Sequence, residues 1–375
     1  MVTRALRGER TQPLVDRPPG QSAQPAVRPS GLLSPRPMRI VEVVRETADA
    51  VSIHLAPEDG SELCHLPGQF LSFDVEVRGE TLRRAYSLAN AALPGARRHI
   101  TVKRVAGGRV SNHLVDHAAA GQVLRVFGPS GDFVVRPDPS RRRKLVLLAG
   151  GSGITPIVSI AETVLAVEPF SQLVLIYGNR RIDDVIFRER LDALVARYGS
   201  RFVVDHVLEE ADEGWPGARG RLDAAVTSER LDALGFEGDD VDYYVCGPAP
   251  MREAVREALR ARGVTTIHEE RFHSPEDRTE GADDRDVQPV TIRAHGRIVE
   301  ARAEPGQTLL EAGLAAGVEM PFSCAMGGCG ACRVRLREGE VRADEPNCLS
   351  DEERAEGFVL ACCSRPRTPV TLELP

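Results

Sequence analysis

Four cysteines near the end of the chain have a spacing that could hold a metal cluster. Cys324, Cys329 and Cys332 are separated by four and two residues, and Cys362 follows after a further 29 residues. A C-x4-C-x2-C segment followed by a distant cysteine is the plant-type arrangement of thiolates around a [2Fe–2S] centre. The sequence therefore predicts an iron–sulfur cluster with these four cysteines as candidate ligands.

The glycines between the cysteines favour a tight loop around such a cluster. Gly327, Gly328 and Gly330 permit positive φ angles and a close approach of the backbone. Backbone N–H groups that point at the sulfurs would tune the reduction potential. A zinc site is one alternative, but these gaps fit pairs of zinc-binding cysteines poorly. Buried structural cysteines are a second alternative, which so glycine-rich a loop disfavours.

The fourth ligand has a neighbour of the same type, since Cys362 and Cys363 are adjacent. On a strand their side chains would face opposite ways, so only one could point into the loop. The segments Pro321–Cys324 and Leu360–Cys362 resemble the flanks of the plant-type ferredoxin family, over about residues 288–375. The resemblance implies that Cys362 is the ligand and that Cys348 and Cys363 are packing residues.

A second motif, Arg84-Ala-Tyr86-Ser87, lies on an expected strand. An arginine can pair with a phosphate through its planar fork, and a tyrosine offers an aromatic face for a ring. The motif resembles the R-x-Y-S segment of the ferredoxin–NADP⁺ reductase superfamily. That resemblance implies a flavin, with Ser87 near its reactive nitrogen. Because strand residues alternate, local bending is needed for all three side chains to reach it.

About 20 residues later, Gly107-Gly108-Arg109-Val110-Ser111 opens an expected helix. Free N–H groups at a helix N-terminus attract phosphate. In the superfamily this segment binds the flavin pyrophosphate, which implies a role for Gly107, Gly108, Val110 and Ser111. The resemblance favours FAD, with FMN as the alternative.

A glycine-rich turn follows the apolar run Leu145–Ala149 and precedes another expected helix. Its candidate nucleotide-binding residues are Gly150, Gly151, Gly153, Thr155 and Pro156. The glycines would let the backbone approach a pyrophosphate at the start of the helix, and proline suits the first helical turn. Thr155 could reach the nicotinamide or the flavin. A purely structural turn is the alternative.

Two later segments resemble further parts of the superfamily. Cys246-Gly247-Pro248 ends an expected strand, and the resemblance places its cysteine beside the nicotinamide C4 position. A small buried residue at a strand end is the alternative for Cys246. The segment Glu270-Arg-Phe272 resembles the one that returns to the flavin, which makes Glu270 and Phe272 candidate site residues.

The choice between NADH and NADPH stays open. Arg180 and Arg181 follow the second strand of the expected nicotinamide domain and could meet a 2′-phosphate. Arginines on a polar loop are more often simply solvated.

These motifs divide the chain into three domains and two connecting segments. Residues 1–37 hold seven prolines and six arginines, against Glu9 and Asp16, which predicts a disordered extension of charge +4. It could be a docking arm or a plain solvated tail. Short strands over 38–138, one of them at Ile100–Val105, predict an antiparallel flavin barrel. Alternating strands and helices over 142–273, with helices near Ile154–Val167 and Asp184–Tyr198, predict a parallel doubly wound nicotinamide domain. An acidic linker at 274–286 precedes an α+β, β-grasp ferredoxin domain at 287–375.

Composition limits the classes of function. The formal charge is −7 and the hydrophobic fraction 42%, which argues for a soluble protein and against a dedicated nucleic-acid binder. The longest apolar stretch, Leu145–Val167, is broken by glycines and Pro156, so no membrane span is expected. Eight cysteines are too few for a disulfide scaffold, and no secretory signal is visible, which favours the cytoplasm.

The order of the domains resembles the reductase components of multicomponent oxygenases, such as ketosteroid 9α-hydroxylase and phenylacetyl-CoA epoxidase, and also desaturase reductases. It implies an NAD(P)H-dependent oxidoreductase in which hydride passes to FAD and single electrons pass through [2Fe–2S] to a partner oxygenase, hydroxylase or desaturase. The partner could be membrane-bound, with peripheral association of this chain. A redox-sensing module with little turnover is the alternative. A self-sufficient oxygenase is disfavoured, because no haem, Rieske or di-iron motif is evident.

Overall fold

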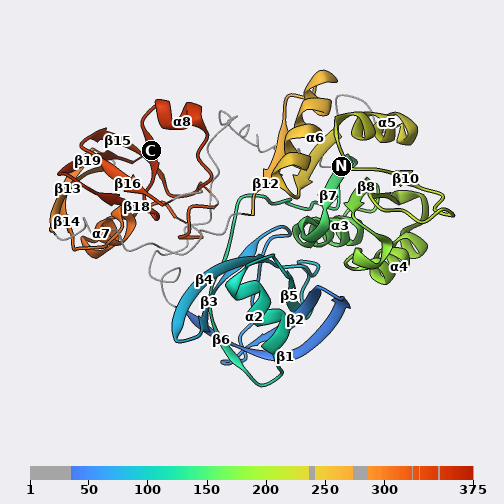
Figure 1. Cartoon of the computed structure of the whole chain (residues 1–375), viewed down its shortest axis with the longest axis horizontal. Helices are drawn as coiled ribbons and strands as arrows, with labels where there is room; N and C mark the ends of the chain where they lie inside the picture. The colour runs from blue at the N-terminus through green and yellow to red at the C-terminus, as the bar shows by residue number, and fades with distance from the viewer. Residues whose placement is uncertain are drawn as a thin grey trace, which may run out of the picture.

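The computed structural model describes residues 35–235, 241–272, 286–294, 296–322, 324–328, 330–344 and 347–374. The N-terminal extension up to residue 34, nearly all of the acidic linker and Cys329 lie outside these ranges. Figure 1 shows three units: a blue barrel, a green-to-yellow α/β unit and an orange-to-red unit that ends the chain.

The N-terminal unit is an antiparallel sheet of six strands in the order β4-β3-β6-β1-β2-β5. A bridge between Leu88 and Ile100 links the two outer strands, so the sheet curls into the expected barrel. Helix α2 (Arg109–His117) packs Val110 and Leu114 against the core of the barrel. The strands are β1 (Arg36–Thr47), β2 (Ala50–Pro57), β3 (Phe70–Val77), β4 (Glu80–Ser87), β5 (Arg98–Lys103) and β6 (Val123–Ser130).

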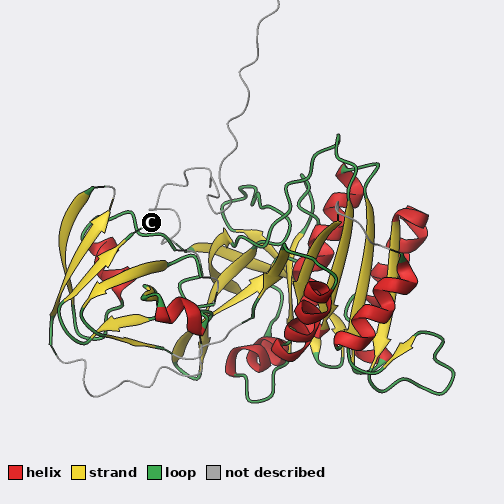
Figure 2. Cartoon of the chain, turned by 90° about the horizontal axis from the view of Figure 1, so that it is seen from above, coloured by secondary structure: helices red, strands yellow, loops and turns green. Residues whose placement is uncertain are grey.

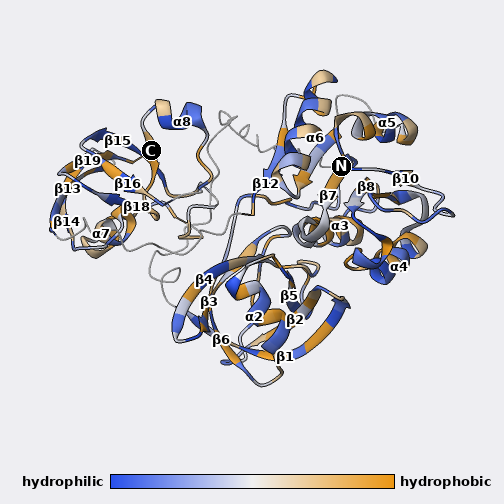
Figure 3. Ribbon diagram, viewed as in Figure 1, coloured by the Kyte–Doolittle hydropathy of each residue, from blue (hydrophilic) through white to orange (hydrophobic). Residues whose placement is uncertain are grey.

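The second unit is a parallel sheet in the order β10-β9-β8-β7-β11-β12, with helices on both faces (Figure 2). Residues Leu145–Ala149 of its central strand β7 are fully buried, as expected for a strand covered on both sides, and Figure 3 draws this strand in hydrophobic orange. Its strands are β7 (Lys144–Gly150), β8 (Gln172–Asn179), β9 (Phe202–Leu208), β10 (Ala218–Arg219), β11 (Val241–Cys246) and β12 (Ile267–Glu270). Its helices are α3 (Ile154–Val167), α4 (Arg188–Tyr198), α5 (Ala224–Leu234) and α6 (Ala249–Ala261).

The strand order of this sheet determines where a ligand can lie. The chain runs outward from β7 to β8 and β9, and later returns to the other side of β7 with β11. Ligands of such sheets bind beyond the carboxyl ends of the strands at the point where the order reverses. That point lies between β7 and β11, whose ends carry the glycine-rich turn and Cys246.

The C-terminal unit is a mixed sheet, β14-β13-β19-β15-β17, with α7 (Leu309–Ala315) packed on β13 and β14. Capping boxes begin both α7 and the short α8 (Asp351–Ala355). The sheet's strands are β13 (Gln288–Ala294), β14 (Arg297–Ala303), β15 (Arg333–Glu338), β17 (Phe358–Leu360) and β19 (Val370–Glu373), while β16 (Val341–Ala343) pairs separately with β18 (Ser364–Pro366). The predicted fold class is thus confirmed for all three units.

Three local predictions were wrong. The strand expected to reach Val105 ends at Lys103. The helix expected from Asp184 begins at Arg188, because Ile182–Asp184 form a 3-10 turn and Phe187 has a left-handed φ of 65°. Cys362 and Cys363 lie in a turn after β17 and not on a strand, so strand alternation does not separate their side chains. None of the helices in the described ranges is long and apolar enough to cross a membrane.

Candidate flavin and iron–sulfur site

A cavity of about 560 Å³ lies where the three units meet, and it brings together all the residues predicted to bind the flavin from the R-x-Y-S motif and the start of the following helix. Its walls come from the end of β4, the start of α2, the turn before α3, the end of β12 and the cysteine loop. The predicted residues that line it are Arg84, Tyr86, Ser87, Gly107, Gly108, Val110, Ser111, Thr155, Glu270, Phe272 and Cys324.

The R-x-Y-S motif occupies the last residues of β4. All four residues from Arg84 to Ser87 line the cavity, so the strand end places both of its faces there. Tyr86 packs its ring against Phe73 with 5.9 Å between centroids, and burial raises the pKa of its phenol. The phenol therefore stays protonated and offers a neutral, fixed aromatic wall.

The start of α2 is suited to an anion. Gly108 precedes the helix without a side-chain cap, so N–H groups of the first turn are left for a ligand. A Cβ on Gly108 would lie 2.5 Å from the Ser111 hydroxyl, which explains why glycine stands there. Arg84 and two cations that the motifs did not predict, Lys103 and Arg109, line the same cavity. These donors and cations fit a flavin nucleotide with its phosphates.

The glycine-rich turn packs against the end of β11 and mostly does not line the cavity. A Cβ on Gly153 would collide with the carbonyl oxygen of Cys246. The Tyr177 hydroxyl donates a 2.9 Å hydrogen bond to the Gly151 carbonyl, which fixes the turn from β8. Of the expected nucleotide contacts here, Thr155 lines the cavity, whereas Gly150, Gly151, Gly153, Pro156, Gly247 and Pro248 do not.

Cys246 and Glu270 end neighbouring parallel strands and are paired in register. Cys246 is fully buried, and burial raises the pKa of its thiol, so it is a neutral group. Burial also raises the pKa of Glu270 to about 7, although a hydrogen bond from the Arg271 N–H to its carboxylate opposes the shift. Phe272, in contrast, is 48% exposed at the edge of the cavity.

The two arginines that follow β8 lie away from this cavity. Arg180 forms a 2.7 Å ion pair with Glu210, and Arg181 lies 3.6 Å from Asp184. Neither lines the cavity that holds the flavin motifs.

The cysteine loop is shaped to present sulfurs to a cluster. The sulfurs of Cys332 and Cys362 lie 3.1 Å apart, and the Gly327 N–H points at the Cys362 sulfur, also at 3.1 Å. The Met326 N–H lies 3.4 Å from the Cys324 sulfur. The loop uses positive φ angles at Ala325, Gly327 and Gly330.

The loop chemistry fits a [2Fe–2S] cluster, because buried thiols and N–H donors converge without disulfides among the described cysteines. No group of three or more histidine, cysteine or acidic side chains meets as a metal site within the described ranges, which omit Cys329.

A small apolar contact joins this loop to the barrel. Phe70 and Ala85 from β3 and β4 pack against Cys324 and Met326. The motifs did not predict Phe70 or Met326. For Met326, an apolar side chain inside a glycine-rich loop could have indicated a contact with another domain. The contact places the cysteine loop against the cavity wall.

Family models match all three units. The oxidoreductase FAD-binding domain matches residues 37–135, the oxidoreductase NAD-binding domain 147–257, and the 2Fe-2S iron-sulfur cluster binding domain 292–367. The chain is 34% identical over 342 residues to a subunit of 1,2-phenylacetyl-CoA epoxidase from Escherichia coli (strain K12), covering 88% of this chain and 95% of that protein. The chain belongs to the three-domain oxygenase reductases of the ferredoxin–NADP⁺ reductase superfamily.

Further likenesses agree with this family. The chain is 37% identical over 348 residues to the ferredoxin reductase component of 3-ketosteroid-9-alpha-monooxygenase from Mycobacterium tuberculosis (strain CDC 1551 / Oshkosh), covering 88% of this chain and 93% of that protein. The solved structure of phthalate dioxygenase reductase aligns with a TM-score of 0.59 and 25% identity over 91% of this chain and 98% of that one.

The predicted activity and cofactors are thereby confirmed. The chain is an NAD(P)H-dependent oxidoreductase with FAD-, NAD- and [2Fe–2S]-binding domains. It carries electrons from NAD(P)H through FAD to the cluster for an oxygenase.

Proposed function

We propose that the chain is the reductase component of an oxygenase or hydroxylase and that its flavin ring lies in the cavity between the three units. The observation that carries this proposal is that one cavity is lined by the R-x-Y-S residues, the start of α2, Thr155, Glu270 and the cysteine loop. When bound, the flavin takes two electrons as hydride from NAD(P)H and passes them singly to the cluster.

The side chains divide the work of holding the flavin. Arg84 and the N–H groups of the first turn of α2, at Arg109–Ser111, bind its phosphates, and Tyr86 packs against the ring system. Ser87 and Thr155 present hydroxyls to the reactive edge from opposite domains. Glu270, buried and with its pKa near 7, holds or releases a proton beside that edge.

The nicotinamide lies over the switch point between β7 and β11. The turn at Gly150–Gly153 approaches the pyrophosphate, and Pro156 lies in the first turn of α3, which begins at Ile154. Cys246, Gly247 and Pro248 close the far side, where the neutral thiol packs near the nicotinamide without acting as a nucleophile. Phe272 covers the exposed edge of the cavity.

Cys324, Cys329, Cys332 and Cys362 hold the cluster, and Cys348 and Cys363 do not. The hydrogen bonds from Met326 and Gly327 to ligand sulfurs support this set. The need for reduced cysteines favours the cytoplasm as the location. A membrane-bound acceptor such as a desaturase is the alternative to a soluble oxygenase. Binding of the chain to vesicles that carry a desaturase would favour the first acceptor, and binding to a soluble oxygenase would favour the second.

The test is Cys332→Ser, with Cys348→Ser as the matched control. Cys332→Ser should lose the visible absorption of the cluster and the electron flow to one-electron protein acceptors, yet retain NAD(P)H-dependent ferricyanide reduction directly from the flavin. Cys348→Ser should keep all three properties. Equal loss of both activities in Cys332→Ser, with its flavin retained, would contradict the assignment.

A redox-sensing module remains the second candidate, and steady-state turnover separates it from a reductase. The presence of the R-x-Y-S residues, Thr155, Glu270 and the cysteine loop around one cavity favours turnover. A chain reduced by NADH or NADPH only once, without sustained reduction of an electron-accepting dye, would instead be a sensor.

A further inference from the structure

The order of the strands indicates where the adenosine end of the nucleotide must lie. If the nicotinamide lies near Cys246 at the end of β11 and the pyrophosphate over the turn after β7, the rest of the molecule extends away from β11. The next strand in that direction is β8, which pairs with β7 along its whole length. In doubly wound folds the ribose 2′ position is recognised near the end of this second strand.

The loops at this end of the sheet are rich in acidic side chains. Residues 180–184 and 209–213 contain two arginines and six aspartates or glutamates. Backbone hydrogen bonds tie the two loops together, from the Glu209 N–H to the Asn179 carbonyl at 3.0 Å and from the Glu210 N–H to the Arg180 carbonyl at 2.8 Å. The acidic residues therefore belong to the same small surface as the arginines.

Both arginines already have carboxylate partners. Arg180 forms its 2.7 Å ion pair with Glu210, and this hydrogen bond raises the pKa of the guanidinium. Arg181 pairs with Asp184. On the neighbouring strand connection, Arg221 lies 3.2 Å from Glu209. A 2′-phosphate would have to displace these carboxylates and would then face their unpaired negative charge.

The end of β8 also carries a neutral hydrogen-bonding group. The Asn179 side chain is only 5% exposed, and neither atom of its amide has a hydrogen-bond partner among the described residues. This buried amide is neutral, so it adds no positive charge that would attract a 2′-phosphate to the end of β8.

From this arrangement we propose that the chain prefers NADH to NADPH, and that Glu210, through its pair with Arg180, is a residue that determines this specificity. The inference rests on the proposed placement of the nucleotide across β7 and β8. Glu210 acts by occupying the arginine that a 2′-phosphate would need, and by repelling that phosphate.

The experiment compares kcat/KM for NADH and NADPH in ferricyanide reduction by the holoenzyme. The wild type should favour NADH by about tenfold or more, and Glu210→Gln should raise kcat/KM for NADPH by roughly threefold to tenfold while changing NADH less than twofold. Glu257→Gln, on the exposed surface of α6, makes the same change in charge and should alter neither value. Equal or higher kcat/KM for NADPH in the wild type would overturn the proposal.

Two further measurements separate this inference from the proposed function. Arg180→Ala should change kcat/KM for NADPH by less than twofold; a selective large loss would make Arg180 a phosphate ligand and the proposal wrong. Calorimetry with 5′-ADP and 2′,5′-ADP reports the preference without turnover, and tighter binding of 2′,5′-ADP would also overturn it. If neither nucleotide reduces the flavin, the proposed function fails, while the calorimetric comparison still decides the preference.

Discussion

The flavin barrel meets the nicotinamide domain and the ferredoxin domain through contacts of different kinds. Between the barrel and the nicotinamide domain, the junction is buried and contains both hydrogen bonds and apolar contacts. The Ser159 hydroxyl donates to the Asn90 carbonyl at 2.7 Å, and Arg190 donates to the Ala89 carbonyl at 2.9 Å. The apolar core of the nicotinamide domain also continues into the barrel, through Ala50, Ala89, Phe133 and Val135.

Toward the ferredoxin domain the contact is small. Among the described residues, the barrel contributes Phe70 and Ala85, which pack against Cys324 and Met326. A 3.3 Å hydrogen bond from the Arg271 guanidinium to the Cys348 carbonyl joins the ferredoxin domain to the nicotinamide domain instead. The difference matches the chemistry: hydride transfer needs two ring systems held in van der Waals contact, whereas a single electron tolerates a looser approach. We infer that the first two domains unfold together and that the ferredoxin domain can leave its contact.

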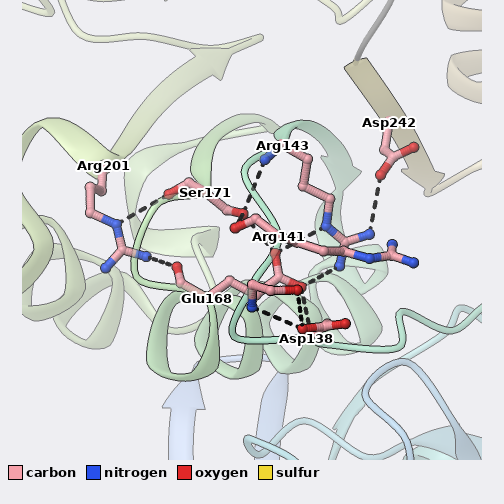
Figure 4. A network of polar contacts seen from close by, with 8 residues as sticks. Asp138, Arg141, Arg143, Glu168, Ser171, Arg201 and Asp242 are labelled. Atoms are coloured by element: carbon pink, nitrogen blue, oxygen red, sulfur yellow. Dashed lines mark hydrogen bonds and ion pairs between the residues drawn. The ribbon is translucent and has the colours of Figure 1, made fainter. Parts of the chain in front are cut away.

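The largest expected effect is at the segment that connects the barrel to the nicotinamide domain. Glu168 is fully buried and pairs with Arg143 at 2.6 Å, and its carboxylate also accepts from Ser171 and from the Asp138 N–H (Figure 4). Burial alone would raise the pKa of Glu168, but these hydrogen bonds outweigh it and lower the pKa. Glu168→Ala leaves the buried Arg143 with the partly exposed Asp242 at 3.2 Å as its remaining carboxylate partner, and should cost about 3 kcal/mol in chemical denaturation.

Glu42→Ala is the control, because Glu42 forms an exposed ion pair with Arg97. It should cost less than about 1 kcal/mol. If Glu168→Ala unfolds the nicotinamide domain while the barrel keeps its flavin, the two domains do not share one unfolding transition. The inference that they unfold together would then be wrong.

A pH titration tests the same junction. His99 lies at this junction, with Arg190 3.1 Å from its ring nitrogen and the tilted His54 ring 4.7 Å away between centroids. Burial, with Arg190, His54 and Arg97, lowers the pKa of His99 to about 3. Because the unfolded histidine binds protons more readily, stability present at neutral pH is lost as pH falls below about 6.5, by roughly 2 kcal/mol between pH 6.5 and pH 5.

Replacement of His99 by glutamine should reduce this slope of unfolding free energy against pH. Replacement of the exposed His117 on α2 by glutamine should leave it as in the wild type. An unchanged slope in His99→Gln would mean that other groups govern the acid sensitivity of the junction.

The sequence predicted the pieces of the site better than their contacts. The cysteine spacing, the R-x-Y-S residues and the glycine-rich turn are each proposed to bind a cofactor through local geometry, and a short motif is enough to predict such a role. Helix α3 has the predicted bounds because Gly153 caps its start, Pro156 suits its first turn and mostly apolar residues fill it. The positions of these segments in one cavity follow from the topology of the sheets.

What the sequence did not show depends on tertiary contacts. Lys103 was placed inside a longer strand, and its position in the cavity follows from where β5 ends. Phe70 reads as an ordinary apolar strand residue, and only the fold reveals that it contacts the cysteine loop. The strand alternation used for Cys362 and Cys363 failed because the tight turn after β17 overrides it.

The smallest effect on stability is expected at Met326. For this residue the measured quantity is the rate at which the flavin reduces the cluster. Met326→Ala removes the side chain that packs against Phe70 but leaves the core of each domain intact. The free energy of unfolding of the barrel should change by less than about 1 kcal/mol. The loss of apolar contact should lower the equilibrium constant for docking of the ferredoxin domain on the barrel by about tenfold. In stopped-flow absorbance, NADH should reduce the flavin at the wild-type rate, whereas reduction of the cluster should slow.

Met326→Leu keeps an apolar side chain of similar volume and should restore most of the rate of cluster reduction. Scattering at small angles should show a larger radius of gyration for Met326→Ala than for Met326→Leu, because fewer molecules hold the ferredoxin domain against the barrel. A barrel destabilised by Met326→Ala as much as by Glu168→Ala would show that this contact is also part of a shared core. The ferredoxin domain would then be as firmly joined as the nicotinamide domain, and delivery of electrons could not rely on its release.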